Sequence, residues 1–584
     1  MNTGCGVLRT QPIDCGSGVR LERGAACRMS DGTQLYSDHY YPAVRQGSTP
    51  GKNPTLLMRQ PYGRDIASTV VNAHPVWFAS HGYNVVIQDV RGRGDSEGEF
   101  YPFRNERRDG AETIAWLRTR PESDGRIGMY GFSYQGMTQL LAAAARPEGL
   151  VCIAPAMTAH DLYHGWFYQG GALRLASSLG WGLQMLKADA RRLKLRDASD
   201  ALEAAWISLG LQAWPAPYGR HTALQFAGLP AYVRDWFEHD EPGQYWSELD
   251  VSTSVADIDV PALHLSGWYD TYLQGSIDGF LTLCKHAGSK FARDNQYLVA
   301  GPWVHIPWGD RAGEAHFGDE ALLDTDALLL RWFNHWLRDS GEFASEPRVR
   351  HFALGANRWF ECAEWPASPQ VQSYFLHSGG RANSRKGDGC LSAGPPDQDQ
   401  PRDVFVYDPE VPVLAPGGPA ATSGGSNQAQ LELGNNVLVY TTEPLSQPLH
   451  VCGSASVSLY CATSADHSDF TSKLVRLTPD GVAHFIAIGM ARSSLLFREP
   501  GYRADQVHCW RFALEPTSCV FAAGDCIRLE IASSAFPLFD RNPSAAVKPC
   551  EADSWSWLRS TQFVLHDADH PSALHLPVLE GPAS

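Results

Sequence analysis

A serine stands between an apolar run and a run that favours a helix. The hexapeptide Gly131-Phe-Ser-Tyr-Gln-Gly136 follows the apolar stretch 127–130 and leads into the alanine-rich stretch 137–146. Small residues on either side let a strand and a helix approach closely, while a tight turn holds the serine hydroxyl exposed. The first amides of the helix and its dipole favour negative charge there. The string predicts a nucleophile elbow at Ser133, with a plain helix N-cap as the alternative.

An elbow serine needs a histidine base and a carboxylate, which in α/β-hydrolases follow in the order serine, acid, histidine. The apolar stretch 260–267 predicts a buried strand, and Asp270 comes just beyond its carboxyl end. The stretch 296–301 predicts the next strand, and His305 lies on the loop after it. Because functional groups collect at the carboxyl ends of parallel strands, we expect Ser133, Asp270 and His305 to meet.

Other histidines and carboxylates are weaker candidates for the same roles. His264 lies inside a predicted strand and His316 in a Gly/Ala-rich loop. Asp278 lies on a predicted helix, and Asp310 follows His305 too closely in the chain to orient it in this topology. A histidine taken at random is most often structural. Placement at a strand end therefore selects Asp270 and His305.

The elements that must position these groups follow from the apolar pattern. Residues 18–158 alternate short apolar strands with helical stretches, which predicts a parallel sheet with helices on its faces. In 159–253 the strand pattern gives way to helix-compatible sequence rich in Trp, Leu and Ala, typical of an inserted helical cap. The strand pattern returns in 254–365. We expect an α/β-hydrolase domain in two parts, interrupted by the cap.

The texture changes again in 366–582, where short β-branched and aromatic runs alternate with Gly, Pro, Asn and Asp turns. This pattern predicts an all-β sandwich. The segments 378–401 and 415–428 are polar and rich in Gly, Pro and Ser, which indicates loops. Sugar-binding modules use sandwiches of this kind, so a lectin-like role is the alternative for this domain, although a fold alone does not establish a function.

Composition limits the classes of partner. With 584 residues the chain is too long for one core, and 43% hydrophobic residues fit a folded protein. A net charge of −16 argues against nucleic acid or an anionic membrane as a partner. No apolar run reaches the ~18 residues of a membrane span, and the N-terminal residues resemble no signal peptide, so we expect a cytoplasmic protein.

The 13 cysteines form no Cys-x-x-Cys pair and no local cluster with histidines. Zinc spacing is therefore absent, and we expect no metal and no catalytic cysteine. The 18 tryptophans exceed ordinary core needs and indicate an apolar pocket.

Ordered strings along almost the whole chain resemble the bacterial cocaine esterase and X-prolyl dipeptidyl-peptidase family of serine hydrolases. Besides the elbow, the matching strings are Arg59-Gln-Pro-Tyr62, Gly82 to Gly92 with Ser96-Glu-Gly-Glu-Phe100, Ala159-His-Asp-Leu-Tyr163, Gly170-Gly-Ala172, Gly267-Trp-Tyr-Asp270, Gly301-Pro-Trp-Val-His305, Ser533-Ser-Ala-Phe-Pro537 and Phe539-Asp-Arg-Asn542. So many matches in one order are far more specific than any single motif.

The resemblance implies a role for each matching residue. Ser133 would be the nucleophile, His305 the general acid and base, and Asp270 the orienting carboxylate. Tyr62 and the backbone amide of Tyr134 would form the oxyanion hole, although Tyr62 without the resemblance is a turn residue after a proline. A phenol can stabilise an oxyanion without burying a charge. The resemblance also implies a jelly-roll C-terminal domain and no cofactor.

Substrate choice is less marked in the sequence. Some relatives that bind a free α-amine carry carboxylates just after the triad acid, whereas 271–276 holds none, which argues against an amine-specific site unless an acid elsewhere in the cap takes that place. The resemblance places four aromatic residues, Trp166, Phe167, Trp181 and Tyr272, along an acyl pocket, where they would suit an apolar or aromatic acyl group. Packing within the cap is the alternative for each of them.

These observations predict a cofactor-independent serine hydrolase that cleaves carboxylic esters of small molecules through an acyl-enzyme. An amide or peptide hydrolase, or an acyltransferase, with the same triad is the main alternative. A non-catalytic binding protein on a hydrolase scaffold is a remote one. The oligomeric state is left open, with a homodimer among the options.

Overall fold

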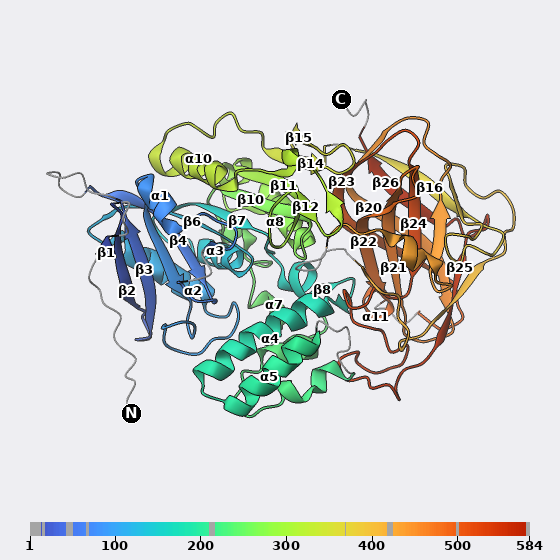
Figure 1. Cartoon of the computed structure of the whole chain (residues 1–584), viewed down its shortest axis with the longest axis horizontal. Coiled ribbons are helices and arrows are strands. Elements are labelled where there is room, and N and C mark those ends of the chain that lie inside the picture. Colours follow the sequence, from blue (N-terminus) through green and yellow to red (C-terminus); the bar gives the residue numbers. More distant parts are fainter. Residues whose placement is uncertain are drawn as a thin grey trace.

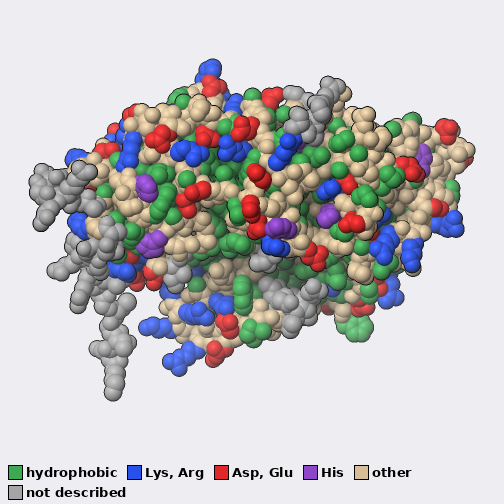
Figure 2. Space-filling view, turned by 45° about the horizontal axis from the view of Figure 1, so that its top comes forward, with side chains coloured by type: hydrophobic (Ala, Val, Ile, Leu, Met, Phe, Trp, Pro, Cys, Tyr) green, Lys and Arg blue, Asp and Glu red, His purple; other side chains and the backbone are tan. Residues whose placement is uncertain are grey.

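The computed structural model describes residues 13–14, 18–42, 51–65, 69–209, 216–367, 369–416, 424–497 and 502–579. These residues form an α/β part, a group of helices beside it and a β-rich part that contacts both (Figure 1). On the face shown in Figure 2, basic and acidic side chains are interspersed over both ends of the molecule. No helix among the described residues has the length and apolar character needed to cross a membrane.

One sheet runs through the α/β part and draws its strands from both sides of the cap. Its strands, in spatial order, are β1 (Ile13–Asp14), β2 (Arg20–Arg28), β3 (Gln34–Tyr41), β5 (Asn84–Asp89), β4 (Asn53–Gln60), β6 (Ser123–Phe132), β7 (Leu150–Ala156), β10 (Ala262–Tyr269), β11 (Gln296–Val304), β14 (Val349–Ala353) and β15 (Arg358–Cys362). The seven strands from β5 to β14 are parallel to one another. At both edges of the sheet the strands pair antiparallel: β1, β2, β3 and β5 at one edge, and β14 and β15 at the other. Strands β1 to β3 follow one another without a helical crossover, as do β14 and β15, and such direct connections give antiparallel neighbours.

Alternate residues of the central strands point to opposite faces of the sheet. Leu56 and Met58 of β4 pack in one cluster with Phe78 of α1 (Pro75–Ser80) and Phe333 of α10 (Thr325–Arg338). Leu57, between them, packs on the other face with residues of α2 (Glu106–Arg118) and α3 (Tyr134–Ala144). Because both faces are covered, the strands read as continuous apolar runs. Helix α8 (Leu273–His286) packs against β10 and β11, the strands that precede Asp270 and His305, and α9 (Lys290–Asp294) packs against α8.

The stretch 159–253 is mostly helical. It contains a π-helical turn (Tyr163–Phe167), α4 (Leu175–Arg192), α5 (Arg196–Leu209), α6 (Tyr232–Glu238) and α7 (Gln244–Ser247). A two-stranded hairpin of β8 (Tyr168–Gln169) and β9 (Ala172–Leu173), which the sequence pattern does not reveal, also lies here. It is too short to show alternation.

The β-rich part begins at β16 (Gln370–His377) and ends at β26 (Ala573–Val578). Between them lie β17 (Cys390–Ser392), β18 (Asp403–Tyr407), β19 (Leu438–Thr441), β20 (Leu449–Thr463), β21 (Asp469–Leu477), β22 (Ala483–Arg492), α11 (Ser493–Leu496), β23 (His508–Phe521), β24 (Cys526–Ala532) and β25 (Ser560–Leu565). The predicted loop 378–401 contains β17, and 417–423 of the other predicted loop lie outside the described residues.

This β-rich part is joined to the hydrolase sheet by backbone hydrogen bonds. Leu354, just after β14, donates to the Ser518 carbonyl at 2.9 Å and accepts from the Val520 amide at 2.8 Å. One hydrophobic cluster includes residues of β11, β14, β20 and β23, so the junction between the two parts is packed.

Candidate active site

The serine of the elbow has a strained backbone. Ser133 follows β6 and precedes α3, and its φ of 61° and ψ of −126° lie where non-glycine residues are rarely found. Neighbouring glycines make the turn feasible: a Cβ on Gly131 would lie 2.6 Å from Gln135, and one on Gly136 would lie 2.8 Å from Thr158. Strain of this kind concentrates at functional sites, and the geometry matches a nucleophile elbow.

The strand register brings the acid and the histidine together. Parallel pairing of β10 with β11 sets Tyr269 opposite Val304, so the residues that follow, Asp270 and His305, leave the sheet side by side. His305 Nδ1 lies 2.5 Å from Asp270 Oδ2. The other carboxylate oxygen accepts from the Tyr272 amide at 2.8 Å. Asp270 is fully buried with both oxygens bound, and Nε2 is the ring nitrogen of His305 that this pairing leaves for another partner.

Ser133 and His305 open onto one cavity of about 400 Å³. Its lining comprises Tyr62, Val70, Phe132, Ser133, Gln135, Ala176, Ser177, Gly180, Trp181, Gln184, Trp206, Thr271, Tyr272, His305 and Ile306. These described lining residues include His305 but no Asp, Glu, Lys or Arg. A mostly apolar cavity with a few convergent polar groups is typical of a small-molecule site.

Tyr62 lies in the cavity wall next to the serine. Burial raises the pKa of Tyr62 to about 12, while polar interactions with Trp181 and Ser133 lower it in part. The phenol therefore keeps its proton across the working range of an enzyme and is a neutral donor. The Tyr134 amide, first in α3, has no partner within its own helix and is available as a donor at the helix start.

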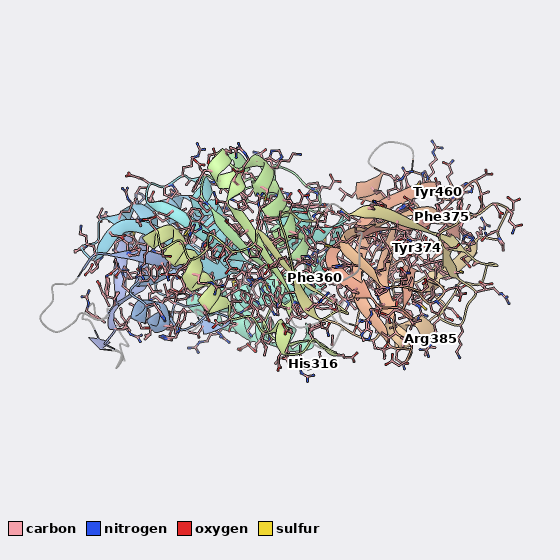
Figure 3. All side chains as sticks on the ribbon, turned by 90° about the horizontal axis from the view of Figure 1, so that it is seen from above. His316, Phe360, Tyr374, Phe375, Arg385 and Tyr460 are labelled. Carbon is pink, nitrogen blue, oxygen red and sulfur yellow. The ribbon has the colours of Figure 1, made fainter. Side chains whose placement is uncertain are left out.

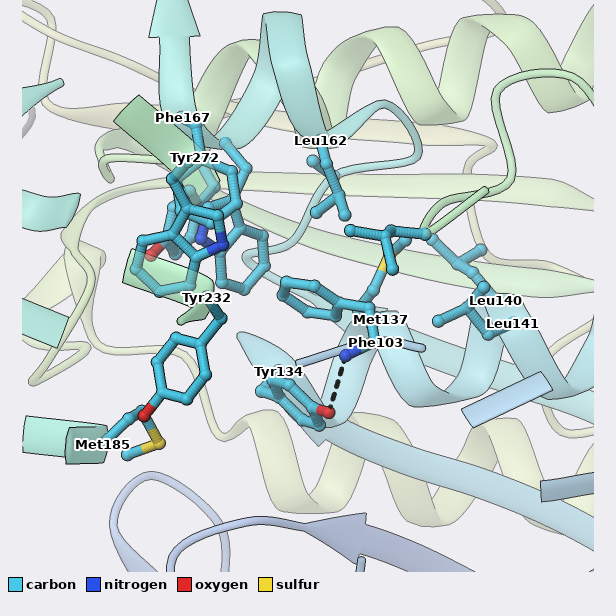
Figure 4. Packing of buried hydrophobic residues seen from close by; sticks show 14 of the residues in the cluster. Phe103, Tyr134, Met137, Leu140, Leu141, Leu162, Phe167, Met185, Tyr232 and Tyr272 are labelled. Carbon is cyan, nitrogen blue, oxygen red and sulfur yellow. Dashed lines mark hydrogen bonds between the residues drawn. The ribbon is translucent and has the colours of Figure 1, made fainter. Parts of the chain in front are cut away.

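The side chain of Tyr134 is anchored from three directions. Its hydroxyl donates to Glu106 Oε1 at 2.8 Å and accepts from the Phe103 amide at 3.0 Å, and its ring stacks on Phe103 with centroids 4.8 Å apart (Figure 4). The other oxygen of Glu106 accepts from Arg59 at 2.5 Å. Burial raises the pKa of Glu106, and Arg59 opposes that rise. The first residue of α3 is thus held by a buried ionic network.

Two of the four predicted pocket aromatics line the cavity and two do not. Trp181 and Tyr272 belong to the lining. Trp166 stacks against the back of Tyr272, with centroids 3.9 Å apart, and is 2% exposed. Phe167 is fully buried between Trp236 and Trp246. The expectation that Trp166 and Phe167 line the pocket therefore differs from the structure, because the π-helical turn that carries them points both rings into the cap core.

The weaker candidates have other partners. His264 is buried within β10 beside Gln296, at 3.1 Å, and burial lowers its pKa to about 4. His316 pairs with Asp310 at 2.8 Å on the surface. Asp278 accepts from a glutamine one turn away on α8. None of the four lines the cavity described above.

Several lining residues escaped the sequence analysis. Ser177, Gly180 and Gln184 recur at helical spacing with the expected pocket residue Trp181, so the four share one face of α4 that forms a cavity wall. This spacing was a usable signal. Trp206, on α5, is 39% exposed at the rim, and only the tertiary packing of α5 against α4 brings it there.

Comparisons with known proteins place the chain in a family. The family model of the X-Pro dipeptidyl-peptidase (S15 family) matches residues 31–307, and that of the X-Pro dipeptidyl-peptidase C-terminal non-catalytic domain matches residues 341–575. The cocaine esterase of Rhodococcus sp. (strain MB1 Bresler) is 31% identical over 575 residues, which cover 94% of this chain and 97% of that protein.

Two solved structures share the fold over nearly the whole length. An aminopeptidase from the marine sediment archaeon Thaumarchaeota archaeon has a TM-score of 0.80 at 23% identity, covering 99% of each chain. An α-amino acid ester hydrolase has a TM-score of 0.77 at 23% identity, covering 99% of this chain and 100% of that one. The predicted family and fold class are confirmed: the chain belongs to the cocaine esterase and X-Pro dipeptidyl-peptidase family and is a serine hydrolase with an α/β-hydrolase fold and a β-rich C-terminal domain.

Proposed function

We propose that this hydrolase cleaves carboxylic esters with an apolar or aromatic acyl group, with Ser133, His305 and Asp270 as its catalytic triad. The observation that carries the proposal is the 2.5 Å contact between His305 and Asp270, at the edge of the cavity that also contains Ser133. Serine, acid and histidine each follow the end of a parallel strand, as the chemistry of this fold requires.

The proposed mechanism is acyl transfer to water in two steps. His305 Nε2 removes the Ser133 proton as the hydroxyl oxygen attacks the ester carbonyl. Tyr62 and the Tyr134 amide donate to the oxyanion. The imidazolium, stabilised by Asp270, protonates the leaving alcohol, and then the imidazole activates water to release the acid.

The lining supports the choice of acyl group. Phe132, Trp181 and Tyr272 give an apolar wall near Ser133. A free α-ammonium group would lose its hydration here and meet no carboxylate among the described lining residues. Burying an unpaired charge is strongly unfavourable. The proposal therefore excludes amino esters as good substrates. For the peptide or amide hydrolase alternative, it likewise excludes substrates that must be bound through a free amine.

Labelling with a fluorophosphonate probe tests the triad. We expect the wild type to be labelled and to release nitrophenol from nitrophenyl benzoate, and Ser133→Ala to lose both properties. Ser177→Ala removes a serine from the same cavity and is the matched control, because Ser177 donates to the Arg174 carbonyl at 3.2 Å and is assigned no chemistry. Labelling that persists in Ser133→Ala would refute Ser133 as the nucleophile.

Paired substrates test the pocket and the reaction type. Methyl phenylacetate and the methyl ester of phenylglycine differ by one α-amino group, and we expect kcat/KM to favour the former by at least ~10²-fold, since an uncompensated charge costs several kcal/mol. A preference for the amino ester would overturn the proposed specificity. Added alcohol that diverts the acyl group from water would indicate the acyltransferase alternative. The cytoplasmic location and the homodimer remain predictions.

A further inference from the structure

A buried cluster of nitrogen and sulfur donors lies where the hydrolase sheet meets the β-rich part. It consists of His351 on β14 and of His450 and Cys452 on β20, and one donor atom from each lies within 4.8 Å of the other two. His351 is 1% exposed, His450 is 5% exposed and Cys452 is 0% exposed. His450 and Cys452 are two apart on one strand and so share a face. None of the three lines the active-site cavity.

The hydrogen bonding of the cluster is incomplete. Nδ1 of His351 has no hydrogen-bond partner among the described residues, although it is buried. A buried polar atom without a partner is unfavourable, and native proteins rarely leave one unexplained. The His351 ring stacks on Phe360, with centroids 5.8 Å apart, and meets Trp365 edge-on at 5.2 Å. The ring is therefore packed against two aromatic side chains while its Nδ1 has no hydrogen-bond partner among the described residues.

The second histidine is oriented from outside the cluster. Its Nε2 lies 2.9 Å from Ser518 Oγ, and the strand register places Ser518 directly opposite Cys452. When Nε2 donates this hydrogen bond, the other ring nitrogen is free to ligate. Ligating histidines are commonly oriented by such a bond to their second nitrogen.

The three donors are of types that a cation takes. A neutral imidazole binds a metal through its unprotonated nitrogen, and a thiol binds as the thiolate, which a bound cation stabilises.

We propose that His351, His450 and Cys452 bind one Zn²⁺ ion, which ties the hydrolase sheet to the β-rich part. Two imidazoles and a thiolate are donors that zinc prefers. Around a tetrahedral zinc, donor atoms lie roughly 3.3–3.8 Å apart, so closure requires shifts of about 1 Å. From the sequence we expected no metal. This proposal revises that expectation by assigning a structural ion, and it assigns no catalytic one.

Cys362 is the candidate for the fourth ligand. His351 faces Phe360 across the β14–β15 pair, and Cys362, two residues further, shares the face of Phe360. Its thiol donates to the Glu364 carbonyl at 3.1 Å, a contact that a metal bond would replace. In Figure 3, Phe360 lies at the junction between the α/β part and the β-rich part, so an ion here would bridge the two.

Metal analysis of the full chain, purified without a polyhistidine tag, tests the site. We expect one zinc per wild-type chain after incubation with zinc and extensive dialysis, and loss of that zinc in Cys452→Ser. Cys461→Ser is the matched control, because Cys461 is equally buried on the same strand but outside the cluster. Reconstitution with Co²⁺ should produce a near-ultraviolet thiolate band in the wild type and in Cys461→Ser, and none in Cys452→Ser.

Thermal unfolding gives a second readout that does not depend on catalysis. A metal that binds only the folded state raises the melting temperature. Zinc should therefore raise the melting temperature of the wild type and of Cys461→Ser, and a chelator should lower it. The melting temperatures of His351→Asn and Cys452→Ser should respond to neither. His264→Asn, at another buried histidine, should respond like the wild type. A wild type that binds neither zinc nor cobalt, or a Cys452→Ser variant that binds them equally, would overturn the proposal.

Discussion

At the scale of the residue, the candidate site combines a strained serine, a tyrosine whose proton is retained through burial and a fully paired aspartate. Ser133 has a positive φ, and Tyr62 keeps its proton because burial raises its pKa to about 12. Asp270 has both oxygens bound, by His305 and by the Tyr272 amide. In the proposed mechanism each of these features pre-organises a group before the substrate arrives, and such pre-organisation is the source of most catalytic advantage.

Replacing Tyr62 by Phe tests its proposed role as an oxyanion donor. We expect kcat for a nitrophenyl ester to fall about 10²- to 10³-fold with little change in KM, since the lost hydrogen bond forms only as the oxyanion develops. Because the pKa of Tyr62 is about 12, the wild-type rate should show no loss from Tyr62 ionisation up to about pH 10. Steady-state kinetics across pH provide the measurement.

Tyr130→Phe is the control for this substitution. Tyr130 is fully buried, its hydroxyl has no partner among the described residues, and it does not line the cavity. Its kcat should match that of the wild type. Equal rates in Tyr62→Phe and wild type would remove Tyr62 from the oxyanion hole.

At the scale of the element, α3 is fixed at its first residue by side chains from elsewhere. Tyr134 is bound to Glu106 of α2 and to the loop at Phe103, and Glu106 is in turn bound to Arg59 of β4. The proposed oxyanion amide belongs to that residue, so this network sets where the amide points.

Tyr134→Phe tests this positioning role. The substitution keeps the backbone amide but removes the bond to Glu106, and we expect kcat to fall about 10-fold or more, because small misplacements of catalytic groups have large effects. It should also destabilise the protein by about 1–3 kcal/mol, since Glu106 loses a buried donor. Kinetics and chemical denaturation provide the two measurements.

Tyr168→Phe separates the two effects. Tyr168 is also buried and donates to the Trp236 carbonyl at 2.7 Å within the cap, away from the elbow. It should lose stability to a similar extent and keep its kcat. A fall in kcat of the same size in both variants would show that Tyr134 acts only through stability.

At the scale of the whole molecule, the β-rich part is bound to the cap through buried polar contacts. Arg492 binds Asp469 and Asp540, and Asp540 accepts from the Leu173 amide and from the Tyr218 hydroxyl. Closer to the site, Arg174 donates to Glu515 of β23 at 2.9 Å, with both side chains buried. The helix that forms one wall of the cavity starts just after Arg174. The C-terminal part therefore shapes the active site without contributing a residue to the described cavity lining.

Glu515→Gln tests the energetics of this contact. Burial raises the pKa of Glu515 from 4.5 to about 7, despite the opposing effect of Arg174. Protonated Glu515 contributes about 3 kcal/mol to the free energy of unfolding. This contribution is complete below pH 4.5 and is lost as the pH rises through 7, because the folded protein then gives up the proton. We expect the variant to match the wild type in melting temperature near pH 5 and to exceed it at pH 8.

An exposed carboxylate serves as the comparison. Glu248→Gln removes a charge from the cap surface and should show no such pH-dependent gain. A Glu515→Gln variant that melts below the wild type at pH 8 would show that the ion pair with Arg174 outweighs the burial of Glu515.

The limits of the sequence appear at particular residues. Strand ends at Asp270 and His305 were predictable because an apolar run ends just before each. Trp166 and Trp181 were indistinguishable, since an aromatic ring that faces a cavity and one that faces a core occur in the same apolar context. The three proposed zinc ligands come from two strands far apart in the chain, His351 from β14 and the pair His450 and Cys452 from β20, so no local spacing joins all three.

By itself, the sequence determined the order of the elements, the elbow at Ser133, the two strand-end groups and the division into α/β, helical and β-rich parts, because periodicity and turn residues act over short range. The tertiary structure alone decided which face each cap aromatic takes, how the edge strands pair, how α4 and α5 enclose the cavity, and that His351 lies beside His450 and Cys452. These features depend on contacts between distant segments, whose energies arise only when the whole chain has packed.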